Sequence, residues 1–394
     1  MRRILYASGS RADYGPIRRV LLQLRSDPAF EVRILVTAMH LDPLHGETWR
    51  EIESDGFLIA DRVPGRVPGD SLAGMAASAG AYMQGISASL DRQRPDIVLV
   101  LGDRVEMLAA TLAAVTQNMV VAHLCGGSSS GSLDDSIRHA ITKLAHVHLP
   151  ALPEHARRIE QMGENPNDVH VVGLPGADLS QDATISSAEI AQSIGLPDAS
   201  PYILVVQHPV THSHAEARSQ MKETLEAVVG TGMYALLANP NDDAGGRAIM
   251  EVQQEYAARH ARLRILRPQA NREQYASTMA HAAVQVGNSS SGILEAQSLG
   301  LPVVNIGERQ RGREHLACAL HAGHDRKAIR AAIDSALNDA SYRSSLQAAR
   351  SAFQKVNTPE AVRNILIGID LKIALKPKLF HDLFDTTIPP PRSP

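Results

Sequence analysis

The chain has few cysteines, no long apolar run and no signal peptide. Only Cys125 and Cys318 occur in 394 residues, which is neither the density of a disulfide scaffold nor CxxC spacing, and it fits a reducing compartment. No run of 18 or more apolar residues exists, which argues against a membrane span. The apolar run that follows the N-terminal arginines is too short for a signal peptide. We therefore expect a cytoplasmic protein with no membrane partner.

Two further absences narrow the range of ligands. The formal net charge is -3 and no lysine-rich run is present, so nucleic acid is not an expected partner. No GxGxxG follows the first apolar segment and no GxxxxGK[ST] occurs, which disfavours NAD(P) and P-loop chemistry. What remains is an ordinary globular composition, 44% hydrophobic and 21% charged, in a chain long enough for two domains.

Short apolar segments alternate with amphipathic ones along most of the chain. "RILYAS", "DIVLVLG", "YILVVQHP" and "LPVVNIGE" are too short for globular helices and resemble strands buried on both faces. This alternation predicts an α/β fold with two Rossmann-like, doubly wound domains facing across a cleft. We expect the first domain at residues 1–175, a hinge rich in Gly, Pro and Ser at 176–200, and the second domain at 201–370. Residues 371–394 form a tail whose end is expected to be disordered.

The segment "VQVGNSSSGILEAQSLGLP" predicts an anion site in the second domain. A strand ends at Gly287 and a polar turn leads into a helix, whose free N–H groups and dipole favour negative charge. Ser289 and Ser290 would face a phosphate, and Glu295 could accept hydrogen bonds from ribose hydroxyls. A plain capped helix is the alternative interpretation of the same residues.

Basic side chains and one histidine also follow strands, where ligands bind in open α/β sheets. His208 comes directly after "YILVVQ" and could donate to a diphosphate or satisfy a backbone carbonyl. Arg11 follows the first strand and could reach across the cleft. Arg309, Arg311 and Arg313 follow a second-domain strand, although a solvated loop is the preferred interpretation for Arg311 and Arg313.

Carboxylates follow strands in the first domain. Asp103 and Arg104 end "DIVLVLGDR", and Asp134 and Asp135 begin the helix in "GSLDDSIRHA". Two carboxylates from different strand ends could converge on one substrate carbon, as proton transfer requires. Asp134 could instead simply cap its helix, and the spacing leaves both interpretations open.

Six motifs in consistent order resemble the hydrolysing UDP-N-acetylglucosamine 2-epimerases of sialic-acid pathways: "GSRADYG", "LGDR", "DDSIRHAITKLAH", "QHPVT", "GNSSSGILEA" and "VNIGERQRGR". The resemblance implies a glycosyltransferase-B-like fold, a UDP-sugar substrate, no metal or other cofactor, and a homodimer or homotetramer. In such enzymes a base removes the C2 proton while UDP leaves C1, and water adds to the resulting glycal to give N-acetylmannosamine. By motif, Asp103, Asp134 and His208 are the implied catalytic residues; Arg11, Arg104, Asn241, Tyr275, Ser289, Ser290, Glu295 and Arg309 are the implied substrate-binding residues. His139 lies in a matching motif without an assigned role.

The chain departs from that family after the strand "MVVAHL". Many relatives read roughly "HIEGGE" here, whereas this chain reads "HLCGGS", so that Cys125 and Ser128 replace two acids. A thiol of ordinary pKa is a poor substitute for a carboxylate, although Cys125 could simply fill space, which is the preferred interpretation. Other acids could carry the proton transfers, or the chain could hydrolyse or isomerise a different sugar nucleotide without C2 inversion. A catalytically silent nucleotide-sugar binding protein is the remaining alternative.

Overall fold

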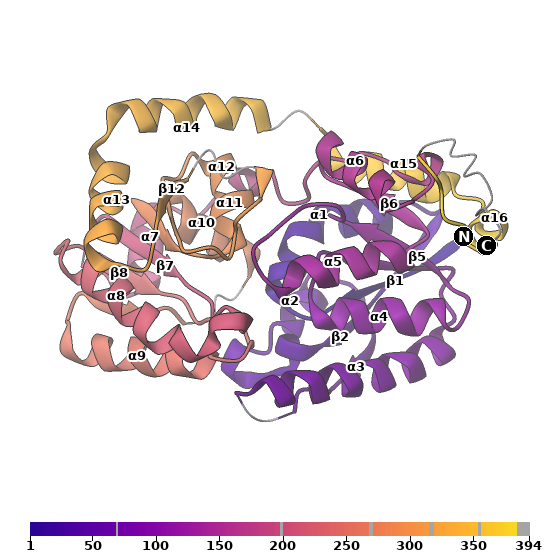
Figure 1. The fold of residues 1–394 in the computed structure, drawn as a ribbon, viewed down its shortest axis with the longest axis horizontal. Helices are drawn as coiled ribbons and strands as arrows, with labels where there is room; N and C mark the ends of the chain where they lie inside the picture. The colour runs from indigo at the N-terminus through magenta and orange to yellow at the C-terminus, as the bar shows by residue number, and fades with distance from the viewer. Residues whose placement is uncertain (68–69, 198–199, 268–270, 315–318, 354–355, 384–394) are drawn as a thin grey trace, which may run out of the picture.

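The computed structural model describes residues 1–67, 70–197, 200–267, 271–314, 319–353 and 356–383, and Cys318 lies outside them. Two parallel β-sheets, each covered by helices on both faces, stand side by side as two halves of the molecule (Figure 1). Each half has two apolar cores, one on each face of its sheet. This arrangement confirms the predicted α/β fold with two doubly wound halves.

The first sheet has the strand order β3-β2-β1-β4-β5-β6, with every pairing parallel. Its strands are β1 (Arg2–Ser8), β2 (Phe30–Thr37), β3 (Leu58–Val63), β4 (Ile97–Leu101), β5 (Val120–Leu124) and β6 (Val147–Leu149). The helices are α1 (Arg11–Ser26), α2 (Trp49–Ser54), α3 (Leu72–Gln93), α4 (Val105–Val115), α5 (Leu133–Leu144) and α6 (Pro153–Gln161). The central strands β4 and β5 are buried almost throughout, which explains their continuous apolar sequences.

The second sheet has the strand order β12-β11-β10-β7-β8-β9. If β7 is counted as its first strand and the sheet is read from the β9 edge, this order is the same as in the first sheet. Its strands are β7 (Tyr202–Val206), β8 (Tyr234–Leu237), β9 (Leu263–Ile265), β10 (Val284–Gly287), β11 (Val303–Ile306) and β12 (Leu320–Ala322). The helices are α8 (Ala217–Val229), α9 (Gly246–Arg259), α10 (Arg272–Ala280), α11 (Ser290–Leu294), α12 (Ala296–Leu299), α13 (Arg326–Asn338) and α14 (Ala340–Phe353). In each sheet the order reverses between two central strands, β1/β4 and β7/β10, and ligands bind beyond the carboxyl ends at such points.

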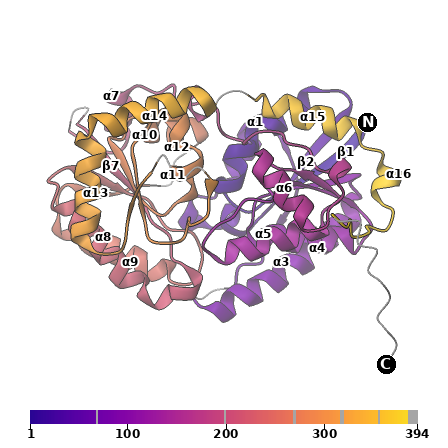
Figure 2. The same cartoon turned by 45° about the horizontal axis from the view of Figure 1, so that its top comes forward.

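The chain returns to the first half near its end, which corrects the expected second domain of residues 201–370. Helix α15 (Thr358–Gly368) packs beside α1 (Figure 2), and Val362 and Leu366 are buried in the core of the first half. Arg2 fixes the end of this helix by donating to the carbonyl oxygens of Leu366 and Ile369 at 2.7 and 2.6 Å. The amphipathic sequence of α15 needs an apolar partner, and the groove beside α1 provides it.

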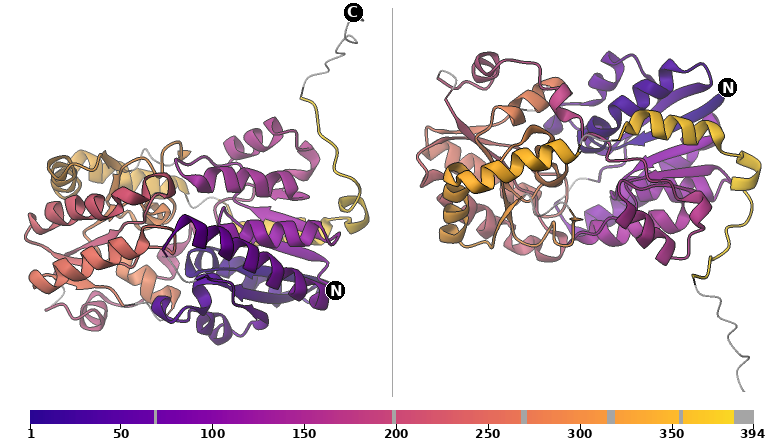
Figure 3. Two further views of the ribbon diagram at one scale, coloured as in Figure 1. Left: turned by 60° about the horizontal axis from the view of Figure 1, so that its bottom comes forward. Right: turned by 90° about the horizontal axis from the view of Figure 1, so that it is seen from above.

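The expected hinge and tail also carry structure. Helix α7 (Ser187–Ser193) lies in the expected hinge, and the buried side chains of Leu179, Ala191 and Leu196 join a core of the second half. After α16 (Leu371–Ala374) the chain runs along the edge of the first half (Figure 3). The expected disorder concerns residues 384–394, which lie outside the described part of the chain. Among the described helices, none is both long and apolar enough to cross a bilayer.

Candidate active site

The turns that follow β7 and β10 lock together at the reversal point of the second sheet. Gly287 has a φ of +139°, and a Cβ there would lie 2.1 Å from the Val206 carbonyl oxygen, so only glycine fits. Asn288, which is 1% exposed, accepts from the His208 backbone N–H at 2.7 Å and donates to the His208 carbonyl at 2.9 Å. The two turns therefore form one rigid polar edge facing the first half.

Helix α11 begins at this edge. Ser289 caps it by accepting from the Ser291 backbone N–H at 3.3 Å, as the capped-helix interpretation expected. Ser290 is the first helical residue and is half-buried. The two serines and the first N–H groups of the helix thus lie together beside His208.

His208 is arranged as a neutral hydrogen-bond donor. Its Nδ1 accepts from the Asn241 backbone N–H at 3.0 Å, so the ring proton of the neutral form sits on Nε2. Burial, assisted by the positive charge of Arg309, lowers the pKa of His208 to about 3. Across the neutral pH range the ring therefore offers one N–H and carries no charge.

Arg309 connects the second half to the first. It is 8% exposed, and its guanidinium donates to the Asn288 carbonyl at 3.2 Å and to Asp134 at 3.2 Å. One side chain thus joins the polar edge around His208 to a carboxylate of the first half. Nearby, the Gly131 backbone N–H donates to the Arg309 carbonyl at 3.0 Å, so the two halves are in direct contact here.

Asp103 is held by two arginines. Arg138, which is 1% exposed, binds it through Nε at 3.1 Å and through a second guanidinium nitrogen, and Arg313 lies 3.6 Å away. Burial opposes ionisation of Asp103, but these positive charges outweigh it and bring its pKa to about 2. The interpretation of Arg313 as part of a solvated loop was wrong, because its side chain is 11% exposed against Asp103; Arg311, at 80%, does face solvent.

Asp134 lies beside Asp103, but its pKa is shifted in the opposite direction. Ser132, not Asp134, is the N-cap of α5, so the capping interpretation of Asp134 was wrong. Burial and then the negative charge of Asp103 raise the pKa of Asp134, and Arg309 only partly opposes them. The site therefore contains one carboxylate that is firmly ionised and one that holds a proton more readily.

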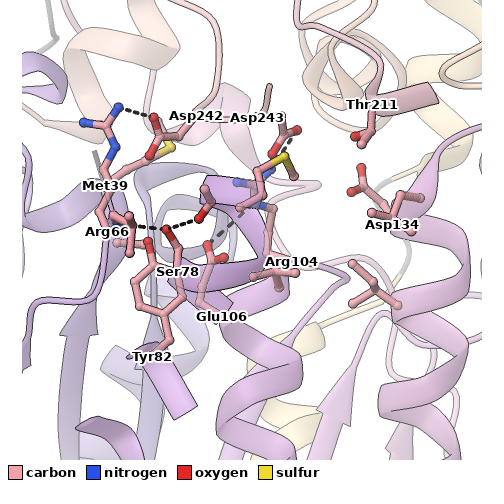
Figure 4. Close-up of a pocket in the computed structure, with 17 residues that line it drawn as sticks. Met39, Arg66, Ser78, Tyr82, Arg104, Glu106, Asp134, Thr211, Asp242 and Asp243 are labelled. Carbon is pink, nitrogen blue, oxygen red and sulfur yellow. Dashed lines mark hydrogen bonds and ion pairs between the residues drawn. The ribbon is translucent and has the colours of Figure 1, made fainter. Parts of the chain in front are cut away.

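A pocket opens beside Asp134 and extends into the first half (Figure 4). Arg104 crosses its mouth, with its guanidinium 3.0 Å from Asp243 of the second half and 3.5 Å from Glu106. The walls come mainly from α3, the start of α4, the first turns of α5 and the segments that follow β2 and β3. Their residues include Met39, Arg66, Val67, Met75, Ser78, Tyr82, Leu133, Ile137, Thr211 and Asp242.

At the other end of the cleft, polar contacts link the two halves around Glu295. Arg11 is paired with Glu51 of its own half at 3.1 Å, and Glu51 also accepts from the Arg272 backbone N–H. Arg272 in turn binds Glu295 at 2.9 Å. Burial and the charge of Glu295 raise the pKa of Tyr275, so this ring lies in the same cluster.

The residues that depart from the family pattern lie against Asp103. Cys125 is half-buried, has a left-handed φ of 61° and lies next to Asp103; burial and that carboxylate raise the pKa of its thiol to about 12. Ser128 contributes its carbonyl, which accepts from Arg138 at 2.8 Å. His139 lies 3.5 Å from Asp135, and its buried Nδ1 has no hydrogen-bond partner within the described residues.

Sequence reasoning missed several residues of this site, namely Glu51, Tyr82, Glu106, Arg138, Asp243 and Arg272. Arg138 was within the quoted motif "DDSIRHAITKLAH", and Glu106 lies two residues after "LGDR", but nothing in their spacing distinguishes a buried arginine or glutamate from a solvated one. In the described part of the chain, no three His, Cys, Asp or Glu side chains are grouped to hold a metal ion. The arrangement sets hydrogen-bond donors on one side of the cleft and carboxylates on the other.

Comparison with known proteins identifies the relatives of this chain. The model of the UDP-N-acetylglucosamine 2-epimerase family matches residues 22–367. The hydrolysing UDP-N,N'-diacetylbacillosamine 2-epimerase of Legionella pneumophila is 39% identical over 315 residues, 80% of this chain and 83% of that protein. The UDP-N-acetylglucosamine 2-epimerase of Neisseria meningitidis is 33% identical over 340 residues, 85% and 88% of the two chains. The crystal structure of UDP-GlcNAc 2-epimerase from Neisseria meningitidis bound to UDP-GlcNAc aligns with a TM-score of 0.77 at 17% identity, covering 93% and 99%.

Proposed function

The chain belongs to the UDP-N-acetylglucosamine 2-epimerase family, and from that premise we propose that it catalyses the hydrolysing 2-epimerisation of a UDP-2-acetamido sugar. The substrate would be cleaved to UDP and a free sugar inverted at C2. Support for the hydrolysing type comes from the 39% identical relative, whose name describes that reaction. The sialic-acid-type motifs of the sequence point the same way.

The observation that carries this proposal is the contact of Arg309 with both sides of the cleft. Through Asn288 it belongs to the donor-rich edge of the second half, and through Asp134 it touches the carboxylates of the first half. A sugar diphosphate bound at that edge would place C1 and C2 next to Asp134. A leaving group and a proton acceptor would then act on neighbouring carbons.

The first step is an elimination. Asp134 takes the C2 proton, the C2–H electron pair forms the C1=C2 double bond, and the C1–O bond breaks to release UDP. The raised pKa of Asp134 makes it a stronger base than Asp103, which Arg138 and Arg313 hold as a stable anion. Arg138 and Arg313 also hold the Asp103 side chain in position beside the reacting carbons.

The donor-rich edge stabilises the leaving diphosphate. The Nε2–H of His208, the hydroxyls of Ser289 and Ser290 and the guanidinium of Arg309 are all available to the negative charge that develops on the phosphate oxygen. Preorganised donors of this kind supply a large part of catalysis because they need no reorganisation during the step. Glu295, which is paired with Arg272, would accept hydrogen bonds from the ribose hydroxyls.

The second step is hydration of the glycal. Water adds its hydroxyl to C1 and a proton reaches C2 from the opposite face, so the balance of both steps is substrate plus water giving UDP and the epimerised sugar. The thiol of Cys125 is protonated at neutral pH because its pKa is raised to about 12, so it is not the base of the first step.

Two substrates fit this reaction. UDP-N-acetylglucosamine, giving N-acetylmannosamine, is the simplest UDP-2-acetamido sugar. UDP-N,N'-diacetylbacillosamine, which carries a second acetamido group at C4 and has a methyl carbon as C6, is the substrate in the name of the Legionella relative. Both present the same C1 diphosphate and C2 acetamido group to the residues described above.

NMR in deuterated water tests the reaction with either substrate. Release of UDP together with a C2-deuterated, C2-inverted free sugar is the expected result. UDP release without deuterium at C2 would identify a simple nucleotide-sugar hydrolase. Binding of the UDP-sugar with no turnover would instead identify a nucleotide-sugar binding protein, and either outcome would contradict the proposal.

A further inference from the structure

The turn between β8 and α9 of the second half is held by residues of the first half. We call residues 241–247 the β8 turn, because they lead from the end of β8 into α9. Arg66 of the first half is paired with Asp242, and Arg104 with Asp243 (Figure 4). The position of this turn therefore depends on contact between the two halves.

Asp70 of the first half caps helix α9 of the second half. The helix begins at Gly246, and its N-cap residue Gly245 has no side chain that could accept from the first N–H groups. Asp70 takes this role, because its Oδ1 accepts from the Gly245 N–H at 2.5 Å and its Oδ2 from the Arg247 N–H at 3.0 Å. Although Asp70 is exposed, both of its carboxylate oxygens are used. A carboxylate at this place also interacts favourably with the helix dipole.

Other helices of the second half are capped from within that half. Ser289 caps α11 by accepting from a backbone N–H, and Asp325 caps α13 in the same way. The cap of α9 comes from the other side of the cleft. The start of α9 is therefore complete only when the two halves are in contact.

The other end of the β8 turn contacts His208. The Asn241 backbone N–H donates to Nδ1 of His208 at 3.0 Å. In a neutral imidazole only one nitrogen carries a proton, so this hydrogen bond keeps the proton on Nε2. In the other tautomer the Nδ1 proton would face the Asn241 N–H, and Nε2 could not donate to a ligand.

The two ends of the β8 turn are packed tightly against each other. A Cβ on Gly246 would lie 2.7 Å from the Asn241 carbonyl oxygen, so the start of α9 rests directly on the residue that contacts His208. The Gly246 N–H donates to the Asp243 carbonyl at 3.0 Å, and the Asn241 side chain donates to the Asp243 carboxylate. A shift at the start of α9 is therefore transmitted to Asn241.

We propose that Asp70 is a positioning residue for His208. By capping α9 across the cleft, it holds the β8 turn so that the Asn241 N–H keeps the ring proton of His208 on Nε2. This inference rests on the proposed function, in which that Nε2–H donates to the departing diphosphate. Contact between the halves then sets the diphosphate donor and brings the carboxylates of the first half to the sugar at the same time.

Asp70→Ala and Asp70→Asn are compared with the unmodified full-length protein in two measurements. The first is ¹⁵N NMR of ring-labelled histidines in the free protein at neutral pH, with His208→Gln used to identify the His208 signals. The Nδ1 and Nε2 shifts report the tautomer, and in Asp70→Ala they should move toward a mixture of both forms. The second is kcat/KM for the UDP-sugar, which should fall about fivefold or more, in line with the loss of a helix cap. Asp70→Asn keeps one acceptor oxygen and should lie between the two.

Asp339→Ala is the matched control. Asp339 accepts from the backbone N–H groups of Ser341 and Tyr342 at 2.8 and 3.2 Å. It lies at the junction of α13 and α14, on the outer side of the second half (Figure 1). This variant removes a carboxylate that binds a helix start within one half, and it should leave both the His208 signals and kcat/KM unchanged.

Several results would overturn the inference. A lower kcat/KM in Asp70→Ala with unmoved His208 signals would show that Asp70 acts only on the contact between the halves. Moved signals with an unchanged kcat/KM would show that the tautomer of His208 does not limit the reaction. Equal effects of Asp70→Ala and Asp339→Ala would indicate a general loss of stability.

This inference and the epimerase proposal fail separately, because the NMR measurement requires no turnover. A protein that releases UDP from neither substrate would overturn the epimerase proposal, and the His208 signals would still decide whether Asp70 fixes the ring. A protein that turns over its substrate, but whose His208 signals do not respond to Asp70→Ala, would overturn this inference alone.

Discussion

Asp103 and Asp134 share one site, yet their surroundings act on them in opposite directions. Arg138 and Arg313 keep Asp103 ionised, whereas burial and the charge of Asp103 raise the pKa of Asp134. Neighbouring carboxylates with pKa values pushed apart are a common way to separate the roles of base and electrostatic partner. These opposite pKa shifts therefore predict that Asp134, and not Asp103, accepts the C2 proton.

Replacing Asp134 with asparagine should lower kcat by 10²-fold or more, in line with the usual contribution of a positioned base, about 10²–10⁴-fold. The affinity for UDP should stay within a few-fold, because the donors of the second half remain. In the unmodified protein, kcat/KM should fall as the pH drops through the raised pKa of Asp134, since only the anion accepts the C2 proton. His208 is not expected to contribute to that acidic limb, because its pKa of about 3 leaves it neutral.

Steady-state kinetics and calorimetric titration with UDP measure these effects. Asp325→Asn is the control, because Asp325 is also an aspartate at the start of a helix, but it caps α13 in the second half. Near-normal kcat in Asp134→Asn would remove this residue from the catalytic set.

Cys125→Ser should change kcat by less than about threefold. The thiol keeps its proton at neutral pH, and serine has nearly the same shape, so no ionised group is lost. The left-handed φ of 61° is equally unfavourable for both residues. A kcat reduced by a hundredfold, measured alongside Cys125→Ala to separate lost volume from a lost proton, would show that the thiol takes part in the chemistry.

At the scale of elements, α5 carries much of the site and is fixed at both ends. Its first turns hold Asp134 and Arg138, and its last carbonyls are capped by Lys378 from the C-terminal segment. The Lys378 ammonium donates to the carbonyls of Lys143 and Ala145 at 2.7 and 2.6 Å and pairs with the buried Glu164. A cation at a helix C-terminus also interacts favourably with the helix dipole.

Lys378→Met should lower the apparent melting temperature by a few degrees. It leaves helix carbonyls without donors and removes one cation from Glu164, a loss of about 1–3 kcal/mol. Lys376→Met is the matched control, since Lys376 is exposed and two residues away. Thermal melts followed by circular dichroism compare the two variants. Equal melting temperatures would show that the C-terminal segment only rests on the surface.

The elements also show what the sequence could and could not predict. The strands were predictable because β4, β5, β7 and β10 are short, apolar and followed by polar turns. The partner of α15 was not, because an amphipathic helix fits either sheet equally well and only the groove beside α1 decides. The burial of Arg138 was also unpredictable, because its partner Asp103 lies far away in the sequence.

At the scale of the molecule, the alternating pattern predicted two facing halves, but it contains no information on how far they close. The contacts that close the cleft are made by residues distant in sequence. They include the pairs Arg309–Asp134, Arg313–Asp103 and Arg104–Asp243. Each links a charge of one half to a carboxylate of the other, so the cleft and the catalytic arrangement form together. A substitution that forms a steric barrier to closure of the two halves should therefore lower kcat/KM, even though it changes no group that reacts.

Gly131→Ala provides such a barrier. A Cβ at this position would lie 2.0 Å from the Glu308 carbonyl oxygen of the other half, too close for the closed arrangement. We expect kcat/KM to fall at least tenfold and the radius of gyration with bound UDP-sugar, from small-angle X-ray scattering, to exceed that of the unmodified protein. Gly80→Ala is the control, because nothing lies within 4 Å of a Cβ there and alanine suits the interior of α3. If both variants keep full activity, contact between Gly131 and Glu308 is not required for turnover, and the reaction proceeds in a more open cleft.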